Sequence, residues 1–207
     1  VMAVNNEIGV VQPLAELGAM CRARGALLHT DAAQATGKVA LDVDAMQIDL
    51  LSISGHKMYA PKGIGALYIR RRPRARLLAE ISGGGQERGH RSGTLPVPLM
   101  VALGEAAVIA GAEMSAEGAR LAGLRAMMLD SLRAAHADVF VNGSMDHRVP
   151  GNLNVGFTGV DAEALMAALD SVAISTGSAC TSASVEPSYV LRALGLDDAD
   201  AGASIRI

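Results

Sequence analysis

Two residues with reactive side chains follow apolar runs in this chain. Asp31 follows "ALLHT" (26–30), and Lys57 follows "IDLLSIS" (48–54) within the stretch "SISGHKMY". Lysine is rarely buried in proteins, so a lysine delivered by an apolar strand needs a reason. An ammonium that loses water favours its neutral form, and the neutral amine is a nucleophile that forms covalent bonds with carbonyl groups.

The surrounding pattern predicts that both residues lie at one edge of a parallel sheet, where ligands bind in open α/β folds. Pyridoxal phosphate (PLP) is the cofactor that uses a lysine together with an acid, because the acid pairs with the pyridinium nitrogen. Ser54, Gly55 and His56 precede the lysine with a hydroxyl, a backbone amide and an imidazole, which suit a phosphate. The alternatives are an exposed turn lysine for Lys57 and a helix or turn cap for Asp31.

Other classes of function have little support. His29 and Asp31 could form a metal pair, but no third ligand is nearby, so we expect no metal site. The net charge of -3 gives no general attraction to nucleic acid or to an anionic membrane. The one basic cluster, "RRRPRAR" (70–76), is interpreted as a solvated turn rather than a phosphate-binding patch. We expect no segment that spans a bilayer.

The order of elements predicts an α/β fold with a partial, mostly parallel-sheet, PLP-binding large domain and a partial, smaller α+β domain at the C-terminal side. A helix over 13–25 begins at Pro13 and ends at Gly25. Apolar strands are expected at 26–30, 48–54 and 63–70. We expect residues 1–96 to belong to the large domain, 97–135 to form a connecting helical segment, and 136–207 to belong to the small domain.

The two cysteines stand in unlike surroundings. Cys180 lies in "STGSACTSAS", whose small and polar residues predict an exposed loop rather than a core segment. Cys21 shares the apolar face of the helix over 13–25 and is interpreted as a small buried hydrophobe. Two distant cysteines form no disulfide framework, so we expect a reducing, cytoplasmic setting.

Five motifs carry a resemblance that runs nearly from end to end: "NNEIGVVQP", "HTDAAQATGK", "SGHKMYAPKGIGALY", "GGGQERGHRSGT" and "STGSACTSASVEPSYVLRALGL". With these motifs the chain resembles the cysteine desulfurases of the NifS and IscS group, within the class V aminotransferase superfamily of PLP fold type I. The histidine–lysine motif alone indicates only the superfamily, whereas "GSACTSAS" together with "RSGT" is far more specific. Members of this family carry a phosphate-binding threonine turn and a ring-stacking histidine upstream of this region. We therefore expect the chain to be a middle-to-late part of a longer protein.

The resemblance implies a role for each matching residue in holding PLP. Lys57 would hold the cofactor covalently, and Asp31 would pair with its pyridine nitrogen. The remaining cofactor contacts would be Gln34 and Asn6 with the phenolic oxygen, Ala33 with the ring face, Ser54 and His56 with the phosphate, and Thr94 with the phosphate in the neighbouring subunit of a homodimer.

The resemblance also implies the reaction. Arg206 would bind the substrate carboxylate, and Cys180 would take sulfur from L-cysteine as a persulfide, leaving L-alanine. Cys180 is also a candidate for a transient iron–sulfur ligand. The sulfur would pass to an acceptor protein, such as an iron–sulfur scaffold or a thiolation enzyme. The alternatives are another class V PLP enzyme, such as a selenocysteine lyase or an aminotransferase, and an inactive fragment or scaffold.

Overall fold

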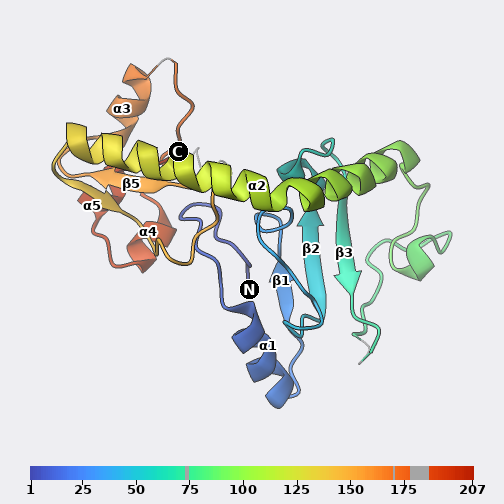
Figure 1. Cartoon of the computed structure of the whole chain (residues 1–207). Coiled ribbons are helices and arrows are strands. Elements are labelled where there is room, and N and C mark those ends of the chain that lie inside the picture. The colour runs from blue at the N-terminus through green and yellow to red at the C-terminus, as the bar shows by residue number, and fades with distance from the viewer. Residues whose placement is uncertain (73–74, 170, 178–186) are drawn as a thin grey trace. The chain divides into compact units, whose positions relative to one another are not determined.

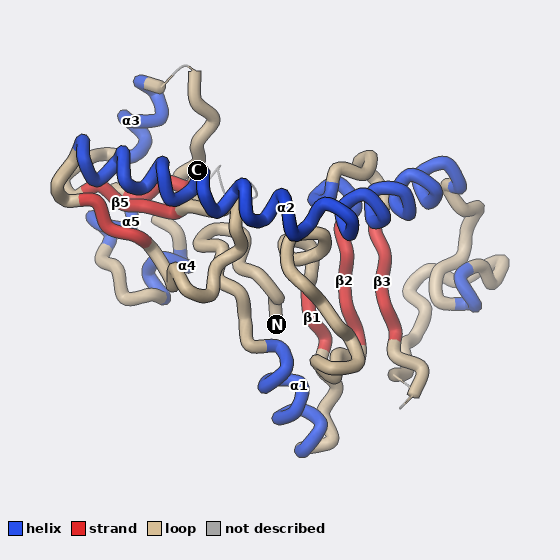
Figure 2. The backbone as a smooth tube through the Cα atoms, in the orientation of Figure 1, coloured by secondary structure: helices blue, strands red, loops and turns tan. Residues whose placement is uncertain are grey.

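The computed structural model describes residues 1–72, 75–169, 171–177 and 187–207 and divides the chain into two compact units. The first unit comprises Val1–Ala3 and Pro13–Met114, and the second comprises Val4–Gln12 and Ser115–Ile207. The α/β class predicted from the sequence is confirmed, because each unit combines a three-stranded sheet with helices (Figures 1 and 2). The predicted domain boundaries stay predictions.

The first unit contains a sheet in the order β1–β2–β3, formed by β1 (His29–Asp31), β2 (Leu50–Ser54) and β3 (Gly65–Ile69). β1 and β2 are parallel, as predicted, whereas β3 is antiparallel to β2. The direction of β3 follows from its connection: residues 55–64 contain only the short 3-10 helix η1 (Gly55–Met58), and a parallel return needs a longer crossover. Two further elements of this unit are α1 (Leu14–Ala23) and the 3-10 helix η2 (Glu87–Gly89).

The predicted helix near the N-terminus is α1, and its ends follow the expected chemistry. Pro13 is its N-cap residue, and Gly25, at a φ of 66°, follows the C-cap and donates its amide to the carbonyl of Arg22. Cys21 is only half-buried, so the interpretation of a buried hydrophobe is too strong. Only Leu14 and Gly18 of α1 are buried, so the rest of the helix, Cys21 included, has little or partial cover.

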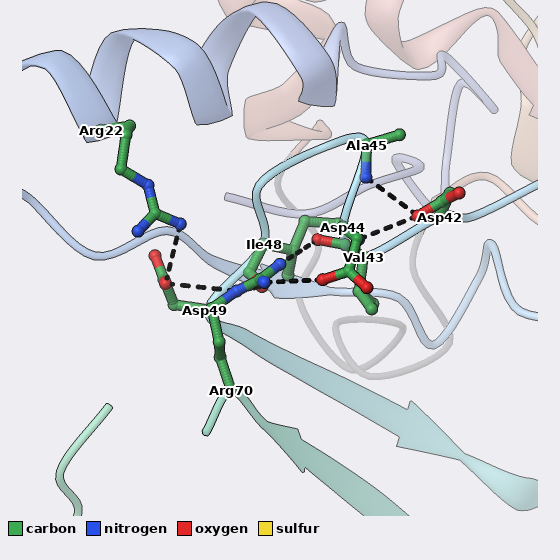
Figure 3. Close-up of polar contacts among 8 residues, drawn as sticks. All are labelled: Arg22, Asp42, Val43, Asp44, Ala45, Ile48, Asp49 and Arg70. Atoms are coloured by element: carbon green, nitrogen blue, oxygen red, sulfur yellow. Dashed lines mark hydrogen bonds and ion pairs between the residues drawn. The ribbon is translucent and has the colours of Figure 1, made fainter. Parts of the chain in front are cut away.

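A buried ionic network holds the sheet at the end opposite to Asp31 and Lys57 (Figure 3). Asp49 directly precedes β2 and accepts the amide of Leu28, which directly precedes β1. Arg70, directly after β3, lies 3.6 Å from Asp49 and donates to the carbonyl of Ile48 and to the carboxylate of Asp44. The expectation of a fully solvated basic cluster is therefore wrong for Arg70, because its guanidinium is buried beside the Asp49 carboxylate, which also binds the amide before β1.

The helix predicted over 97–135 is α2 (Val97–Ala135), which continues from the first unit into the second. In the described ranges, α2 is the one helix long and apolar enough to cross a membrane, which corrects our expectation that no such segment exists. The run was missed because Glu105 and Glu113 interrupt it in sequence. Length and composition alone are weak evidence for a membrane span, because a core helix passes the same test.

The second unit contains an antiparallel sheet in the order β4–β5–β6, formed by β4 (Val139–Val141), β5 (Asn154–Phe157) and β6 (Ser204–Arg206). Its core joins Leu129 of α2 to Val155, Phe157 and Ile205 of the sheet. The short helices are α3 (Ala162–Ala168), α4 (Tyr189–Ala193) and α5 (Asp198–Gly202). Asp161 caps α3, because its carboxylate accepts the amide of Ala164 at 2.8 Å.

Candidate active site

Asp31 and Lys57 lie at the same edge of the sheet in the first unit, as the sequence predicted. Asp31 is the last residue of β1 and pairs with Ser52 of the parallel strand β2. Lys57 lies in η1, which begins directly after β2 ends at Ser54. Because the two strands are parallel neighbours, a carboxylate and an amine lie at the same end of the sheet.

The Asp31 carboxylate also caps the turn that follows it. Its Oδ1 accepts the amide of Ala33 at 2.8 Å, and the amide of Ala32 is bound to the carbonyl of Ser52. The alternative interpretation of Asp31 as a turn cap is therefore confirmed. It does not compete with a ligand role, since a carboxylate has two oxygens and about four acceptor positions.

Lys57 and His56 are exposed in this chain, so the expectation of a desolvated lysine is wrong for the residues described. η1 instead turns Gly55 and Met58 inward. At Gly55 a side chain has no room, because a Cβ there would lie 2.9 Å from the carbonyl oxygen of Ile64. The glycine lets η1 pack tightly against Ile64, while Lys57 stays exposed.

Two polar pairs flank the edge. Ser54 Oγ lies 3.1 Å from His56 Nδ1, which joins the hydroxyl and imidazole predicted to bind a phosphate. His29 Nε2 lies 2.8 Å from Ser52 Oγ, a pair that the sequence analysis missed. Alternation along the strands is the signal that could have found it, since His29 and Asp31 share one face of β1. Among the described residues, no group of three or more His, Cys, Asp or Glu side chains could hold a metal.

Lys38 is a second amine in this region, and the sequence analysis missed it too. Its Nζ lies 3.5 Å from Gln34 Oε1, on the turn that begins at Asp31. Burial, followed by the nearby charge of Lys57, lowers the pKa of Lys38. The spacing of four residues between Gln34 and Lys38 is the signal that could have shown the contact.

Asn6 and Arg206 belong to the second unit and contact each other there. Arg206 donates from Nη1 to the backbone carbonyl oxygen of Asn6 at 2.9 Å. The turn that carries Asn6 is closed by Asn5, whose side-chain oxygen accepts the amides of Glu7 and Ile8. The turn therefore presents a fixed backbone to Arg206.

Glu7 is the buried carboxylate of that turn and was not singled out from the sequence. It is 2% exposed and accepts a short hydrogen bond from the hydroxyl of Ser188, while its backbone carbonyl accepts from Asn152 and Asn154. Thr94 is exposed in the first unit, and Cys180 lies outside the described residues. The individual roles of these residues stay predictions.

The whole chain, residues 1–207, matches the family described as Aminotransferase class-V. The chain belongs to the class-V aminotransferase family. A curated relative in this family, "Cysteine desulfurase IscS" of Tolumonas auensis, is 62% identical over 206 residues, which cover 100% of this chain and 51% of the relative. The chain therefore spans about half the length of the curated relatives it matches.

Solved structures agree with this assignment. The NifS-like protein from Rickettsia africae ESF-5 is 28% identical with a TM-score of 0.89, over 100% of this chain and 54% of that protein. The structure "SspA in complex with cysteine" is 39% identical with a TM-score of 0.80, over 100% of this chain and 56% of that protein. The resemblance to the NifS and IscS group that the motifs predicted is confirmed.

Proposed function

We propose that the full-length protein is a PLP-dependent cysteine desulfurase that converts L-cysteine to L-alanine and leaves the sulfur on Cys180 as a persulfide. The observation that carries the proposal is the meeting of Asp31 and Lys57 at one edge of the parallel pair β1–β2. The relatives named cysteine desulfurase and the solved relative that contains cysteine support the same substrate.

The side chains at this edge fit PLP by their chemistry. Lys57 supplies an exposed primary amine for the aldehyde, and Asp31 supplies a carboxylate for the pyridine nitrogen. Ser54 and His56 form a hydroxyl–imidazole pair at the start of η1, which suits a phosphate, whereas the Gly55 amide expected to join them already donates to the carbonyl of Ile64. Gln34, held on the turn after Asp31, supplies an amide for the phenolic oxygen.

PLP, when bound, supplies an electron-withdrawing ring that stabilises negative charge on the substrate carbon next to the amine. Asp31 keeps the pyridine nitrogen protonated, and Lys57 holds the cofactor and then moves the α-proton of the substrate. Arg206 binds the substrate carboxylate through its planar guanidinium.

Cys180 completes the sulfur transfer as a thiolate. Its sulfur attacks the substrate sulfur, so an S–S bond forms while the bond between sulfur and Cβ breaks. The electron pair left on carbon takes a proton, which gives L-alanine. L-cysteine and one enzyme thiol thus become L-alanine and one enzyme persulfide.

The proposal includes partners and location. Thr94 would reach the phosphate held by the neighbouring subunit of a homodimer, and the persulfide would pass to a sulfur-acceptor protein such as an iron–sulfur scaffold. We place this reaction in the cytoplasm, where thiols stay reduced.

The test is one turnover of the full-length protein with L-cysteine, followed by alanine analysis and peptide mass spectrometry. We expect one alanine per site and the mass of one sulfur atom on the Cys180 peptide. Cys180→Ala should release little alanine, whereas Cys21→Ala should keep nearly full turnover. Transamination to a keto acid would favour another class V enzyme, and a protein that binds no PLP would favour an inactive scaffold. Sulfur found on Cys21 would contradict the mechanism.

A further inference from the structure

Lys38 occupies a position in the candidate site that the proposed reaction does not use. Its side chain is half-buried on the turn between Asp31 and Val39, and its Nζ lies 3.5 Å from Gln34 Oε1. A half-buried lysine needs a compensating interaction, because desolvation of an ammonium is costly. Among the contacts of the described chain, the Gln34 amide oxygen supplies it.

The backbone brings Lys38 close to Lys57 through Gly37. Gly37 has a φ of 75°, and a Cβ at this position would lie 3.6 Å from Met58 Cβ and 2.9 Å from Ala110 Cβ. The turn therefore packs closely against η1, which carries Lys57, and against α2. The lowered pKa of Lys38, caused first by burial and then by the charge of Lys57, agrees with this packing.

The chemistry of the contact determines how the Gln34 amide is oriented. An ammonium has three donors and no acceptor, so it can face only the oxygen end of an amide. With Oε1 directed to Lys38, the NH₂ group of Gln34 is directed elsewhere as a donor. Without Lys38, the amide can rotate and present its oxygen instead, which would repel an anionic oxygen.

We propose that Lys38 is a positioning residue for the cofactor: its ammonium fixes the Gln34 amide so that the NH₂ group donates to the phenolic oxygen of PLP. This inference rests on the proposed function, since it takes PLP to be the cofactor. Lys38 acts through Gln34 and touches no reacting atom.

The test uses the full-length protein and two readouts besides activity: the apparent affinity for PLP and the visible absorbance maximum of the loaded protein at fixed pH. Lys38→Met removes the donors and keeps the length of the side chain. We expect about fivefold weaker PLP binding, the effect of one net hydrogen bond, and a shift of the absorbance maximum in the same direction as in Gln34→Ala.

Three further variants separate positioning from a general structural effect. Lys38→Arg keeps a side chain that only donates, so it should retain the wild-type affinity and spectrum. The double variant Lys38→Met/Gln34→Ala should match Gln34→Ala alone, because both changes remove the same interaction. Lys62→Met, at an exposed lysine, is the matched control and should change neither readout.

The inference is overturned if Lys38→Met leaves both readouts unchanged while Gln34→Ala shifts them, or if the effects of the two single variants add. A wild-type protein that binds no PLP overturns the proposed function itself. The two failures are therefore distinct.

Discussion

Arg206 donates to the backbone carbonyl oxygen of Asn6 across 200 positions of sequence, at 2.9 Å. The backbone of Arg206 is held by its pairing with Asn154 in β5, so the contact with Asn6 fixes the side chain of a residue whose main chain is already fixed. A guanidinium has five N–H donors in a rigid plane, so one donation leaves further donors for a carboxylate. Asn6 thus acts on Arg206 through its backbone, whatever its side chain binds.

This contact leads to a prediction for substrate binding. Arg206→Lys keeps the charge and loses the planar pair of donors, so the KM for L-cysteine should rise about tenfold, as expected for the loss of a charge-assisted hydrogen bond. Steady-state alanine formation by the full-length protein measures it. Arg192→Lys, at the exposed ion pair with Asp198, is the control and should leave KM unchanged. Equal KM values in the two variants would refute the role of Arg206.

The buried network of Asp49 and Arg70 gives a prediction for stability. Asp49→Ala leaves Arg70 without its buried carboxylate partner and the amide of Leu28 without its side-chain acceptor. The free energy of unfolding should fall by about 3 kcal/mol or more, the usual effect of breaking a buried ion pair. Asp44→Ala removes the exposed partner of Arg70 and should cost about 0.5 kcal/mol. Urea denaturation measures the free energy of unfolding of both variants. Equal losses would contradict the prediction that Asp49 stabilises the fold more than Asp44.

Asp42 gives a prediction for pH. Backbone amides of Ala45 and Asp44 donate to its carboxylate and hold its pKa below the ordinary value of 3.8. A carboxyl whose pKa falls on folding stabilises the fold fully above its ordinary pKa and loses that contribution as the pH drops through the lower value.

Asp42→Asn keeps the acceptor oxygen and removes the charge. Urea denaturation should therefore show Asp42→Asn less stable than wild type at pH 7, with a difference that shrinks as the pH falls below 3.8 and disappears below the lowered pKa of Asp42. A difference that stays constant across this range would show that charge plays no part in the turn.

The buried Glu7 gives a prediction for the second unit. Glu7→Ala removes the acceptor of the Ser188 hydroxyl, so the melting temperature should fall in line with a loss of about 2 kcal/mol, typical of a hydrogen bond to a charged group. Glu7→Gln keeps an acceptor oxygen and should lose less. If Gln and Ala variants melt together, the Ser188 contact does not stabilise the fold.

Local chemistry was sufficient to predict some of these features. Gly25 beyond α1 and the placement of Asp31 and Lys57 at the ends of parallel strands both follow from rules that act within a few residues. The burial of Arg70 and the contact of Arg206 with Asn6 could not be predicted this way, because each joins segments far apart in sequence.

The exposure of Lys57 could not be predicted from the neighbouring residues either, which indicated burial. An apolar strand leads to it, but the direction of η1 is set by packing of Gly55 against the carbonyl of Ile64. The importance of Lys38 depends on a close approach of two turns, which the residue types alone do not indicate.

The most direct test of the account is to find which lysine holds PLP. The loaded full-length protein is reduced with borohydride, which makes the linkage between lysine and PLP permanent, and its peptides are analysed by mass spectrometry. Lys57 follows β2 at the edge shared with Asp31, whereas Lys38 faces Gln34 and Lys62 lies on the exposed loop before β3. We expect the pyridoxyl mass on the peptide that contains Lys57. A label on Lys38 or Lys62, or no label on any lysine, would contradict the account.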